Sequence, residues 1–391
     1  MSYYLNDFGL LCALGSGKQA VRQALWQQVG KSLIISDSFS PGQPRYLGQI
    51  QTVLPELPAN LKIYACRNNQ LLMAAALQIM PTIETMKNRF GSQRIGIVLG
   101  TSTSGIRNTE LALAEQAIHQ QLTASYHYKQ QQLGAGADFL AAYLDVSGPY
   151  YSVSAACASS GKAFASAQRL LDLGGCDAVI VGGADSLCAL TVNGFASLES
   201  LSTGLAQPFG QHRDGINIGE AASLFVLSRE PAAIRLAGVA ATNDGYHFSA
   251  PDPTGKAVIS AMQKALSQAS LSSRQVNYIN LHGTGTLLND AMESRAIAEV
   301  FGLNTPVSSS KTLTGHTLGA AAALELALCC LLMTDNEQGL LIANQTNLID
   351  PDLPNLNWVK TGQSLGKPVQ VCQSNSFAFG GSNVSIVVSQ A

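Results

Sequence analysis

Short apolar runs and longer helical patterns alternate along the whole of this 391-residue chain. The runs that are typical of buried strands are 94–99, 150–153, 178–181, 223–227 and 278–281. The patterns that are typical of helices are 108–121, 159–173 and 318–333. Alternation of this kind predicts an α/β protein in which helices pack on parallel or mixed sheets.

The pattern breaks near 229–231, and the parts on either side resemble each other. Each part places a reactive residue between a strand and a helix, Cys157 in the first and His316 in the second. Each part also ends in a Gly-containing stretch that leads into an apolar strand. We therefore expect two similar halves, 1–230 and 231–391.

The composition predicts a large buried core, and it argues against a nucleic-acid-binding, secreted or membrane-spanning protein. The chain is 46% hydrophobic and 12% charged, whereas about 25% charged residues is usual. A net charge of −2 gives no sign of nucleic-acid binding. The N-terminus lacks the pattern of a secretion signal, and no stretch approaches the roughly 18–20 apolar residues of a membrane span. We expect a cytoplasmic protein with reduced thiols, and the 8 cysteines show no zinc-site spacing.

Cys157 is the strongest candidate for chemistry. It lies in Val153-Ser-Ala-Ala-Cys157-Ala-Ser-Ser-Gly161, between the strand at 150–153 and the helix at 159–173. The positive end of a helix dipole favours a thiolate, and a thiolate is a nucleophile. A single cysteine is more often an inert core residue, so the interpretation needs partners for it.

Two of the chain's 6 histidines supply such partners. His282 follows the strand at 278–281 and opens His282-Gly-Thr-Gly-Thr286, while His316 ends Ser308-Ser-Ser-Lys-Thr-Leu-Thr-Gly-His316. Either histidine alone is as well explained by a loop cap. Together with Cys157, they predict a site that binds a polar ligand.

These motifs resemble those of an elongating, ketosynthase II-like β-ketoacyl-acyl-carrier-protein synthase. Further matches are Gln207-Pro-Phe209, Arg213-Asp-Gly215 with Gly219-Glu220, and Asn375-Ser-Phe-Ala-Phe-Gly-Gly-Ser-Asn383. The motifs occur in the family's order from about residue 95 to the end, so the resemblance covers essentially the whole chain. It implies a thiolase-like five-layer α/β/α/β/α fold that is made of two pseudo-symmetric halves.

The resemblance also implies an acyltransferase that makes carbon–carbon bonds. Cys157 would accept an acyl group from acyl carrier protein, and decarboxylation of malonyl-acyl carrier protein would supply the carbanion. His282 and His316 would stabilise the enolate and assist proton movements, since positioned N–H donors stabilise a developing oxyanion. Lys311 would belong to the same catalytic centre, and Glu325 would pair with it because a buried carboxylate needs a partner.

Binding residues follow from the same resemblance. Thr284 and Thr286 would bind the phosphopantetheine arm, and the backbone N–H groups of Cys157 and Phe379 would form the oxyanion hole. Phe379 would also gate the acyl pocket. No metal or resident cofactor is implied, because the substrates are carried on the 4′-phosphopantetheine arm of acyl carrier protein.

The chain departs from the family pattern at two positions. Ala378 stands where glycine is frequent before the gating Phe, and alanine disfavours positive φ, so the gate's motion and the chain-length selectivity stay open. Leu287 stands where proline frequently follows the Thr of the His282 motif.

Three alternatives to a condensing enzyme agree less well with the sequence. A thiolase would need a late Cys-x-Gly motif, but Cys372 is followed by Gln373-Ser374. An initiating synthase would replace His316 by Asn. A non-catalytic chain-length-factor-like subunit would lack Cys157, so we expect this chain to be the catalytic member of any such pair.

The pathway and the subunit arrangement remain open at the level of sequence. Arg67-Asn-Asn-Gln-Leu-Leu72 resembles synthases of bacterial aryl polyene clusters, which favours an aryl polyene or type II polyketide system, with fatty acid elongation as the alternative. The partners implied are acyl carrier protein and either a second copy of the chain or a chain-length-factor-like homologue. Acyl length, unsaturation and the division of proton steps between the histidines are not determined.

Overall fold

The computed structural model describes residues 2–27, 32–346 and 348–391. Its strands are β1 (Tyr4–Cys12), β2 (Gly15–Ser16), β3 (Ile34–Ser36), β4 (Arg45–Leu47), β5 (Ile95–Gly100), β6 (Tyr150–Val153), β7 (Ala178–Asp185), β8 (Ala221–Ser228), β9 (Ile234–Asn243), β10 (Tyr278–Asn280), β11 (Pro306–Ser308), β12 (Asn357–Trp358), β13 (Val371–Ala378) and β14 (Ser382–Gln390).

Its helices are α1 (Lys18–Gln27), α2 (Arg67–Gln78), α3 (Met80–Phe90), α4 (Ile106–His119), α5 (Ala135–Leu144), α6 (Ser159–Asp172), α7 (Ala189–Ser197), α8 (Lys256–Ala269), α9 (Leu287–Phe301), α10 (Lys311–Thr314) and α11 (Ala321–Met333). Short 3₁₀ turns include η5 (Leu318–Ala320) and η6 (Phe379–Gly381).

The main sheet repeats one strand pattern twice. Its order is β12-β11-β10-β13-β14-β9-β1-β8-β7-β5-β6, with β2 attached to β1. In the N-terminal part, β5 pairs in parallel with β6 and β7, while β8 is antiparallel to β7 and β1. In the C-terminal part, β10 pairs in parallel with β11 and β13, while β14 is antiparallel to β13 and β9. The same order and the same directions therefore occur in both parts of the chain.

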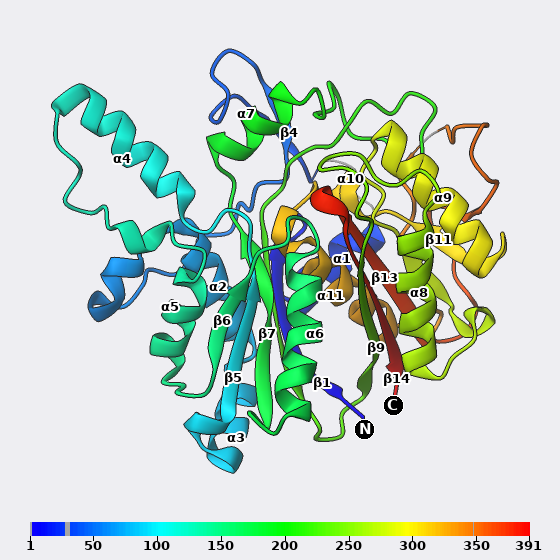
Figure 1. The fold of residues 1–391 in the computed structure, drawn as a ribbon, viewed down its shortest axis with the longest axis horizontal. Helices are drawn as coiled ribbons and strands as arrows, with labels where there is room; N and C mark the ends of the chain where they lie inside the picture. Colours follow the sequence, from blue (N-terminus) through cyan, green and yellow to red (C-terminus); the bar gives the residue numbers. More distant parts are fainter. Residues whose placement is uncertain (1, 28–31, 347) are drawn as a thin grey trace.

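The two parts of the sheet meet only briefly and enclose a central helical layer. β1 and β9 pair through Tyr4 with Arg235 and Leu5 with Ile234. Helices α6 and α11 contact each other and strands from both parts, so they lie between them. Helices α2 and α5 cover the outer face of the N-terminal part, and α8 and α9 flank the C-terminal part (Figure 1). The resulting layers are the α/β/α/β/α arrangement of the thiolase fold.

Helix α11 forms the centre of the molecule, as its apolar sequence predicts. All of its residues are buried, including Glu325. The first residues of the expected 318–333 helix form the 3₁₀ turn η5 instead, and α11 proper begins at Ala321. The strand expected at 178–181 is also longer, because β7 is paired on both sides and continues to Asp185.

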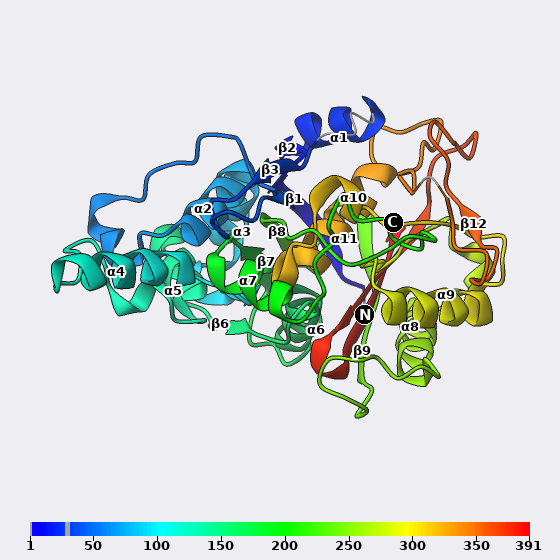
Figure 2. The same ribbon diagram turned by 90° about the horizontal axis from the view of Figure 1, so that it is seen from above.

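Helix α4 lies apart from these layers. It projects from one end of the molecule in both ribbon views (Figure 2). It spans Ile106–His119, close to the expected 108–121, but only Ala112 of this helix is buried. Across the described ranges, no helix is both long and apolar enough to cross a membrane.

Candidate active site

Cys157 lies in a tight turn between β6 and α6. The residue before it, Ala156, has φ 47°, a left-handed conformation that costs a non-glycine residue roughly 1–2 kcal/mol. The Ser159 hydroxyl fixes the turn: Ala155 N–H donates to Ser159 Oγ at 2.8 Å, and that hydroxyl donates to Ala156 O at 2.5 Å. The turn is pressed against the end of β5, because a Cβ on Gly100 would lie 2.1 Å from the Ser160 nitrogen.

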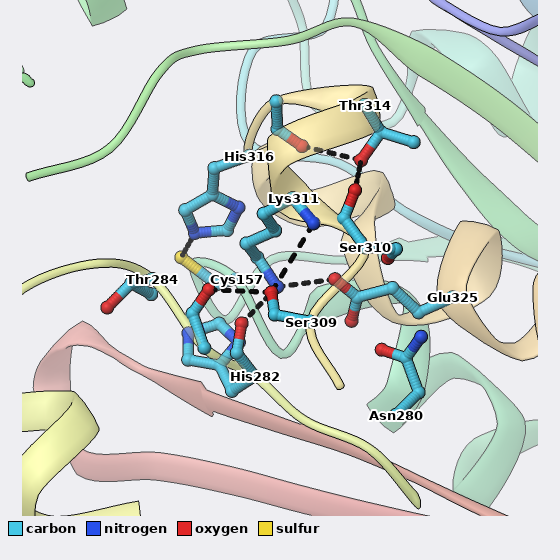
Figure 3. A network of polar contacts seen from close by, with 12 residues as sticks. Cys157, Asn280, His282, Thr284, Ser309, Ser310, Lys311, Thr314, His316 and Glu325 are labelled. Atoms are coloured by element: carbon cyan, nitrogen blue, oxygen red, sulfur yellow. Dashed lines mark hydrogen bonds and ion pairs between the residues drawn. The ribbon is translucent and has the colours of Figure 1, made fainter. Parts of the chain in front are cut away.

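Two backbone hydrogen bonds hold His316 in place. It follows α10, and its N–H donates to Asn217 O at 2.7 Å while Gly219 N–H donates to His316 O at 2.9 Å. This clamp brings His316 Nε2 to 2.9 Å from Cys157 Sγ (Figure 3). Residues that are 159 positions apart in the sequence are therefore in contact.

His282 completes the group from the end of β10. The His282 and His316 rings meet edge to face, with centroids 5.4 Å apart. Within the described part of the chain, ligand atoms of Cys157, His282 and His316 lie within 4.8 Å of one another. Thiol and imidazole are also ligands that soft metal ions take, and the expectation of no metal here stays a prediction.

Lys311 and Glu325 lie directly behind the histidines. The Lys311 ammonium donates to Glu325 Oε1 and to the backbone oxygen of His282 (Figure 3). Both side chains are only 2% exposed. Glu325 is thus paired with Lys311 as the sequence interpretation requires, and the pair joins α10 and α11 to the end of β10.

Burial is the largest influence on the acidity of Cys157. Burial raises the pKa of its thiol to about 12, although the Lys311 charge and the cysteine's own backbone N–H act in the opposite direction. Burial therefore opposes the thiolate that the turn into α6 is expected to favour. Cys157 rests as a thiol in contact with His316.

Both histidines are neutral in the folded protein. Burial, followed by the nearby Lys311 charge, holds the pKa of His282 and that of His316 well below 6.5. Burial, with the Lys311 charge acting in the same direction, therefore favours the uncharged rings, in which one ring nitrogen donates a hydrogen bond and the other accepts one.

A cavity of about 330 Å³ opens onto the three reactive side chains. Its lining includes Cys157, His282, His316, Thr284, Thr286 and Phe379. The two threonine hydroxyls lie 2.9 Å apart on the wall. Six predicted site residues thus meet in one cavity, while Lys311 and Glu325 support it from behind.

Phe379 lies at the cavity and is 39% exposed. Its ring packs against Phe195, with centroids 5.8 Å apart. Ala378 is extended, with φ −109° and ψ 156°, so this conformation imposes no strain on an alanine. Whether Ala378 limits movement of the gate stays a prediction.

Leu287 occupies the first position of α9, directly after the N-cap Thr286. Proline is favoured at the first position of a helix because the N–H that it lacks has no partner within the helix. Any good helix former is also compatible with this position. Leu287 is 61% exposed beside the cavity.

Two buried carboxylates on α9 shape the His282 loop and were missed at the level of sequence. Glu293 accepts from His282 N–H at 2.7 Å and Gly283 N–H at 2.8 Å, and burial raises its pKa to about 8. Asp290 accepts from Phe209 N–H at 2.7 Å and from two N–H groups of the loop. The available signal was two acids three residues apart on one face of the helix that follows the loop.

Arg67 belongs to the interior network and is not a simply solvated residue. It donates to both oxygens of the fully buried Glu220, at 2.8 Å and 2.5 Å. Glu220 also accepts from Ile50 N–H at 2.9 Å and directly follows the Gly219 that binds His316. The Arg67 segment and the Gly219-Glu220 motif thus support the same histidine.

Cys372 plays no part in this cavity. It is fully buried in β13, and its sulfur faces the Cys329 carbonyl at 4.0 Å. Cys372 is therefore not placed as the second catalytic cysteine of a thiolase, in agreement with the missing Cys-x-Gly motif.

Comparison with known proteins places this site in a family. Residues 65–233 match the model "Beta-ketoacyl synthase, N-terminal domain", and residues 233–340 match "Beta-ketoacyl synthase, C-terminal domain". The 3-oxoacyl-[acyl-carrier-protein] synthase 2 of Synechocystis sp. is 31% identical over 336 residues, which cover 80% of this chain and 79% of that protein. Nodulation protein E of Rhizobium meliloti is 29% identical over 404 residues, which cover 99% and 98% of the two chains.

A solved structure agrees over the full length. A chain of "Ketosynthase (ApeO) in Complex with its Chain Length Factor (ApeC) from Xenorhabdus doucetiae" is 44% identical, with a TM-score of 0.95, over 100% of this chain and 98% of that chain. Fold and relatives together define a condensing acyltransferase with the thiolase architecture. The chain belongs to the beta-ketoacyl synthase family, as a ketosynthase II-like member, which confirms the resemblance drawn from its motifs.

Proposed function

We propose that this ketosynthase takes an acyl group from acyl carrier protein onto Cys157 and extends it by two carbons with malonyl-acyl carrier protein. The observation that carries the proposal is the 2.9 Å contact between Cys157 Sγ and His316 Nε2, with His282 beside it at one cavity. A nucleophile and two neutral donors are the groups that this chemistry needs.

In the first step, the Cys157 sulfur attacks the carbonyl carbon of the acyl thioester. Because the pKa of the thiol is about 12, its proton leaves as the attack proceeds, and His316 Nε2 is in place to accept it. The bond from the carbonyl carbon to the pantetheine sulfur then breaks, and that sulfur takes the proton. The backbone N–H groups of Cys157 and Phe379 are proposed to stabilise the intermediate oxyanion.

In the second step, His282 and His316 donate N–H bonds to the thioester oxygen of the malonyl group, with His316 now in the tautomer that carries its proton on Nε2. The bond to the carboxylate breaks, carbon dioxide leaves, and the electron pair forms an enolate that both donors stabilise. The enolate carbon attacks the acyl carbon on Cys157, and the bond from that carbon to the cysteine sulfur breaks. The released cysteine thiolate takes up one proton from solvent, and the product is a 3-oxoacyl-acyl carrier protein.

Thr284 and Thr286 are proposed to bind the amides of the phosphopantetheine arm, since their hydroxyls lie on the cavity wall above Cys157. Phe379 is proposed to gate the acyl group, and Lys311 with Glu325 to keep the histidines neutral and in place. No resident cofactor is needed, because the reactive thioesters are delivered on the carrier's arm.

Intact-protein mass tests the first step. Incubation with acyl-acyl carrier protein should add one acyl group to the wild-type chain and none to a Cys157→Ala variant. Reversal by hydroxylamine would identify the adduct as a thioester. An adduct of equal amount on both proteins would contradict the assignment of Cys157 as the nucleophile.

We also propose that the chain works as the catalytic member of a heterodimer with a chain-length-factor-like homologue. Helix α4 supports this, because it projects from the molecule with exposed apolar side chains, Leu111, Leu113 and Ile118 among them. In the described part of the chain, β6 forms the outer edge of the sheet next to this helix region, so its backbone is available for pairing. A complex of this composition is described for the 44% identical relative.

An aryl polyene or type II polyketide pathway is the proposed context, and fatty acid elongation is the alternative. The two contexts differ in the acyl group, so a panel of saturated, polyunsaturated and aryl-terminated acyl carriers separates them. A preference for conjugated acyl groups supports the polyene pathway. If the chain accepts no acyl group even with a partner present, the reading as a non-catalytic subunit replaces the proposal.

A further inference from the structure

A buried carboxylate that the reaction does not use lies at the end of β7. Asp185 is fully buried and accepts hydrogen bonds from five donors. Thr101 Oγ1 lies 2.7 Å from its Oδ1, and the Ser102 and Thr103 N–H groups each lie 2.8 Å from it. The Thr103 hydroxyl donates at 2.9 Å, and Gly319 N–H donates to Oδ2 at 2.5 Å.

These donors come from two separate segments of the site. Residues 101–103 follow β5, which carries the Gly100 that packs against the Cys157 turn. Gly319 lies three residues after His316, in the turn that leads into α11. Asp185 therefore joins the cysteine side of the cavity to the histidine side through one side chain.

The contact between Asp185 and Gly319 leaves no space for a side chain at position 319. A Cβ on Gly319 would lie 2.8 Å from Asp185 Oδ2 and 2.8 Å from Ser102 Oγ. Contacts this short are essentially absent between real side chains, so any residue larger than glycine must separate the two segments.

Backbone strain on both sides needs such a connection. Leu318, between His316 and Gly319, has φ 51°, and Ala156, next to Cys157, has φ 47°. Strained non-glycine residues persist only where their surroundings hold them in place. The Ser102 hydroxyl donates to Ala156 O at 3.4 Å, while Asp185 holds Gly319 beside Leu318.

We propose that Asp185 is a positioning residue that sets the distance between Cys157 and His316 by binding the loop after β5 and the turn after His316 together. The five donors leave an ionised carboxylate as the acceptor, although burial raises the pKa of Asp185. This inference rests on the proposed roles of Cys157 and His316 and deepens them, because it concerns their spacing and not the chemistry itself.

The first test is an Asp185→Asn variant, which keeps the size of the side chain. The amide nitrogen must face one set of N–H donors, so either Gly319 or the 101–103 loop loses its acceptor. We expect kcat for condensation to fall about 10- to 100-fold with KM for both carrier substrates unchanged, because small misplacements of reacting groups cost that much. A KM increase with unchanged kcat would overturn the proposal.

Gly319→Ala tests the same connection from the other side and keeps the carboxylate. It should lower kcat in the same way, and the double variant should be no slower than the slower single variant, since both changes break one connection. Wild-type kcat in folded Gly319→Ala, or effects that multiply in the double variant, would overturn the proposal. If one single variant fails to fold, the other decides.

Alkylation of the cysteines by iodoacetamide distinguishes a loss of positioning from misfolding. It also distinguishes failure of this inference from failure of the proposed function. The described structure buries all 8 cysteines, so a folded variant should be modified at Cys157, which lines the cavity, and a misfolded one at several. The reagent needs no acyl substrate. At neutral pH, Gly319→Ala should slow Cys157 alkylation if His316 has moved away from the sulfur, even if the wild type proves to condense nothing. An unchanged rate would overturn the proposal.

Discussion

At the scale of single residues, the site is built from groups whose ordinary charge states burial has changed. Cys157 is a thiol, His282 and His316 are neutral, and the charged pair of Lys311 and Glu325 lies directly behind them. The Lys311 charge acts on all three reactive groups: it lowers the pKa of the cysteine and of both histidines. One buried ammonium therefore favours a reactive sulfur and uncharged hydrogen-bond donors at the same time.

The pH dependence of Cys157 follows from this arrangement. Because its folded pKa is raised to about 12, the thiolate fraction should rise about tenfold per pH unit between pH 7 and 10. The rate of iodoacetamide alkylation, followed by intact mass, should rise with pH without a plateau in this window. Lys311→Met should slow the reaction, since it removes the charge that favours the thiolate. A plateau near pH 7 would contradict the predicted burial effect.

Removing one partner of the Lys311–Glu325 pair should lower the free energy of unfolding more than replacing both partners by apolar residues. Lys311→Met leaves Glu325 buried without a partner. Because burial already raises the pKa of Glu325 to about 7, its carboxyl should take up a proton, and the free energy of unfolding should fall by about 1–3 kcal/mol. The double variant with Glu325→Leu should regain most of this loss, because no unpaired polar group remains. Urea denaturation of wild type, single and double variants measures both effects. Equal stability of the single and double variants would contradict the pairing.

Sequence patterns identified the reactive residues of this site but not their charge states. Cys157, His282, His316 and Lys311 stand in motifs that can be recognised without coordinates. The predicted thiolate is opposed by burial, and the depth of that burial depends on how β5, α6 and α11 pack, which no local pattern reports. The roles of Glu293 and Asp290 were missed for a related reason, since their donors belong to a loop that only the fold places above α9.

At the scale of elements, the turn before α6 determines where the nucleophile lies. Ala156 adopts a left-handed conformation, and the Ser159 hydroxyl and the approach of β5 hold it there. The strands and helices around this turn were predicted to within a few residues. The left-handed residue was not, because alanine carries no sequence signal for positive φ.

Replacing Ala156 by glycine should relieve this strain. Glycine adopts positive φ without penalty but loses more backbone entropy on folding, so Ala156→Gly should change the free energy of unfolding by no more than about 1 kcal/mol, in either direction. The matched control is Ala163→Gly, in the middle of α6 and fully buried, which should be destabilised by at least about 1 kcal/mol. Chemical denaturation compares the two variants. Equal losses would show that the turn stores no strain.

At the scale of the whole molecule, the repeated strand order explains why one half carries the nucleophile and the other the histidines. The equivalent strand ends of the two halves face one central helical layer, and the cavity opens where they meet. The two similar halves were visible as a weak sequence pattern, but the layers followed only from the family resemblance. The projecting α4 carries exposed apolar side chains that do not pack into the core of the described part of the chain.

A charge on α4 should therefore disturb assembly. Ile118 is 72% exposed, and Ile118→Glu should reduce the dimer fraction of the isolated chain, or of its complex with a chain-length-factor-like partner. Leu303→Glu is the matched control, because Leu303 is 49% exposed and follows α9 in the other half. Light scattering after size-exclusion chromatography gives the assembly state. Equal effects of the two substitutions would remove the support that α4 gives to a partner interface.

The most direct test of the central claim is the mass of the product released after a complete reaction. Acyl-loaded enzyme, with a chain-length-factor-like partner present, is mixed with malonyl-acyl carrier protein, and the acyl group on the carrier is measured by mass spectrometry. We predict a 3-oxoacyl group two carbons longer than the one supplied, together with free Cys157, and no such product from Cys157→Ala. An acyl group that stays on the enzyme while malonyl-carrier protein is unchanged would contradict it.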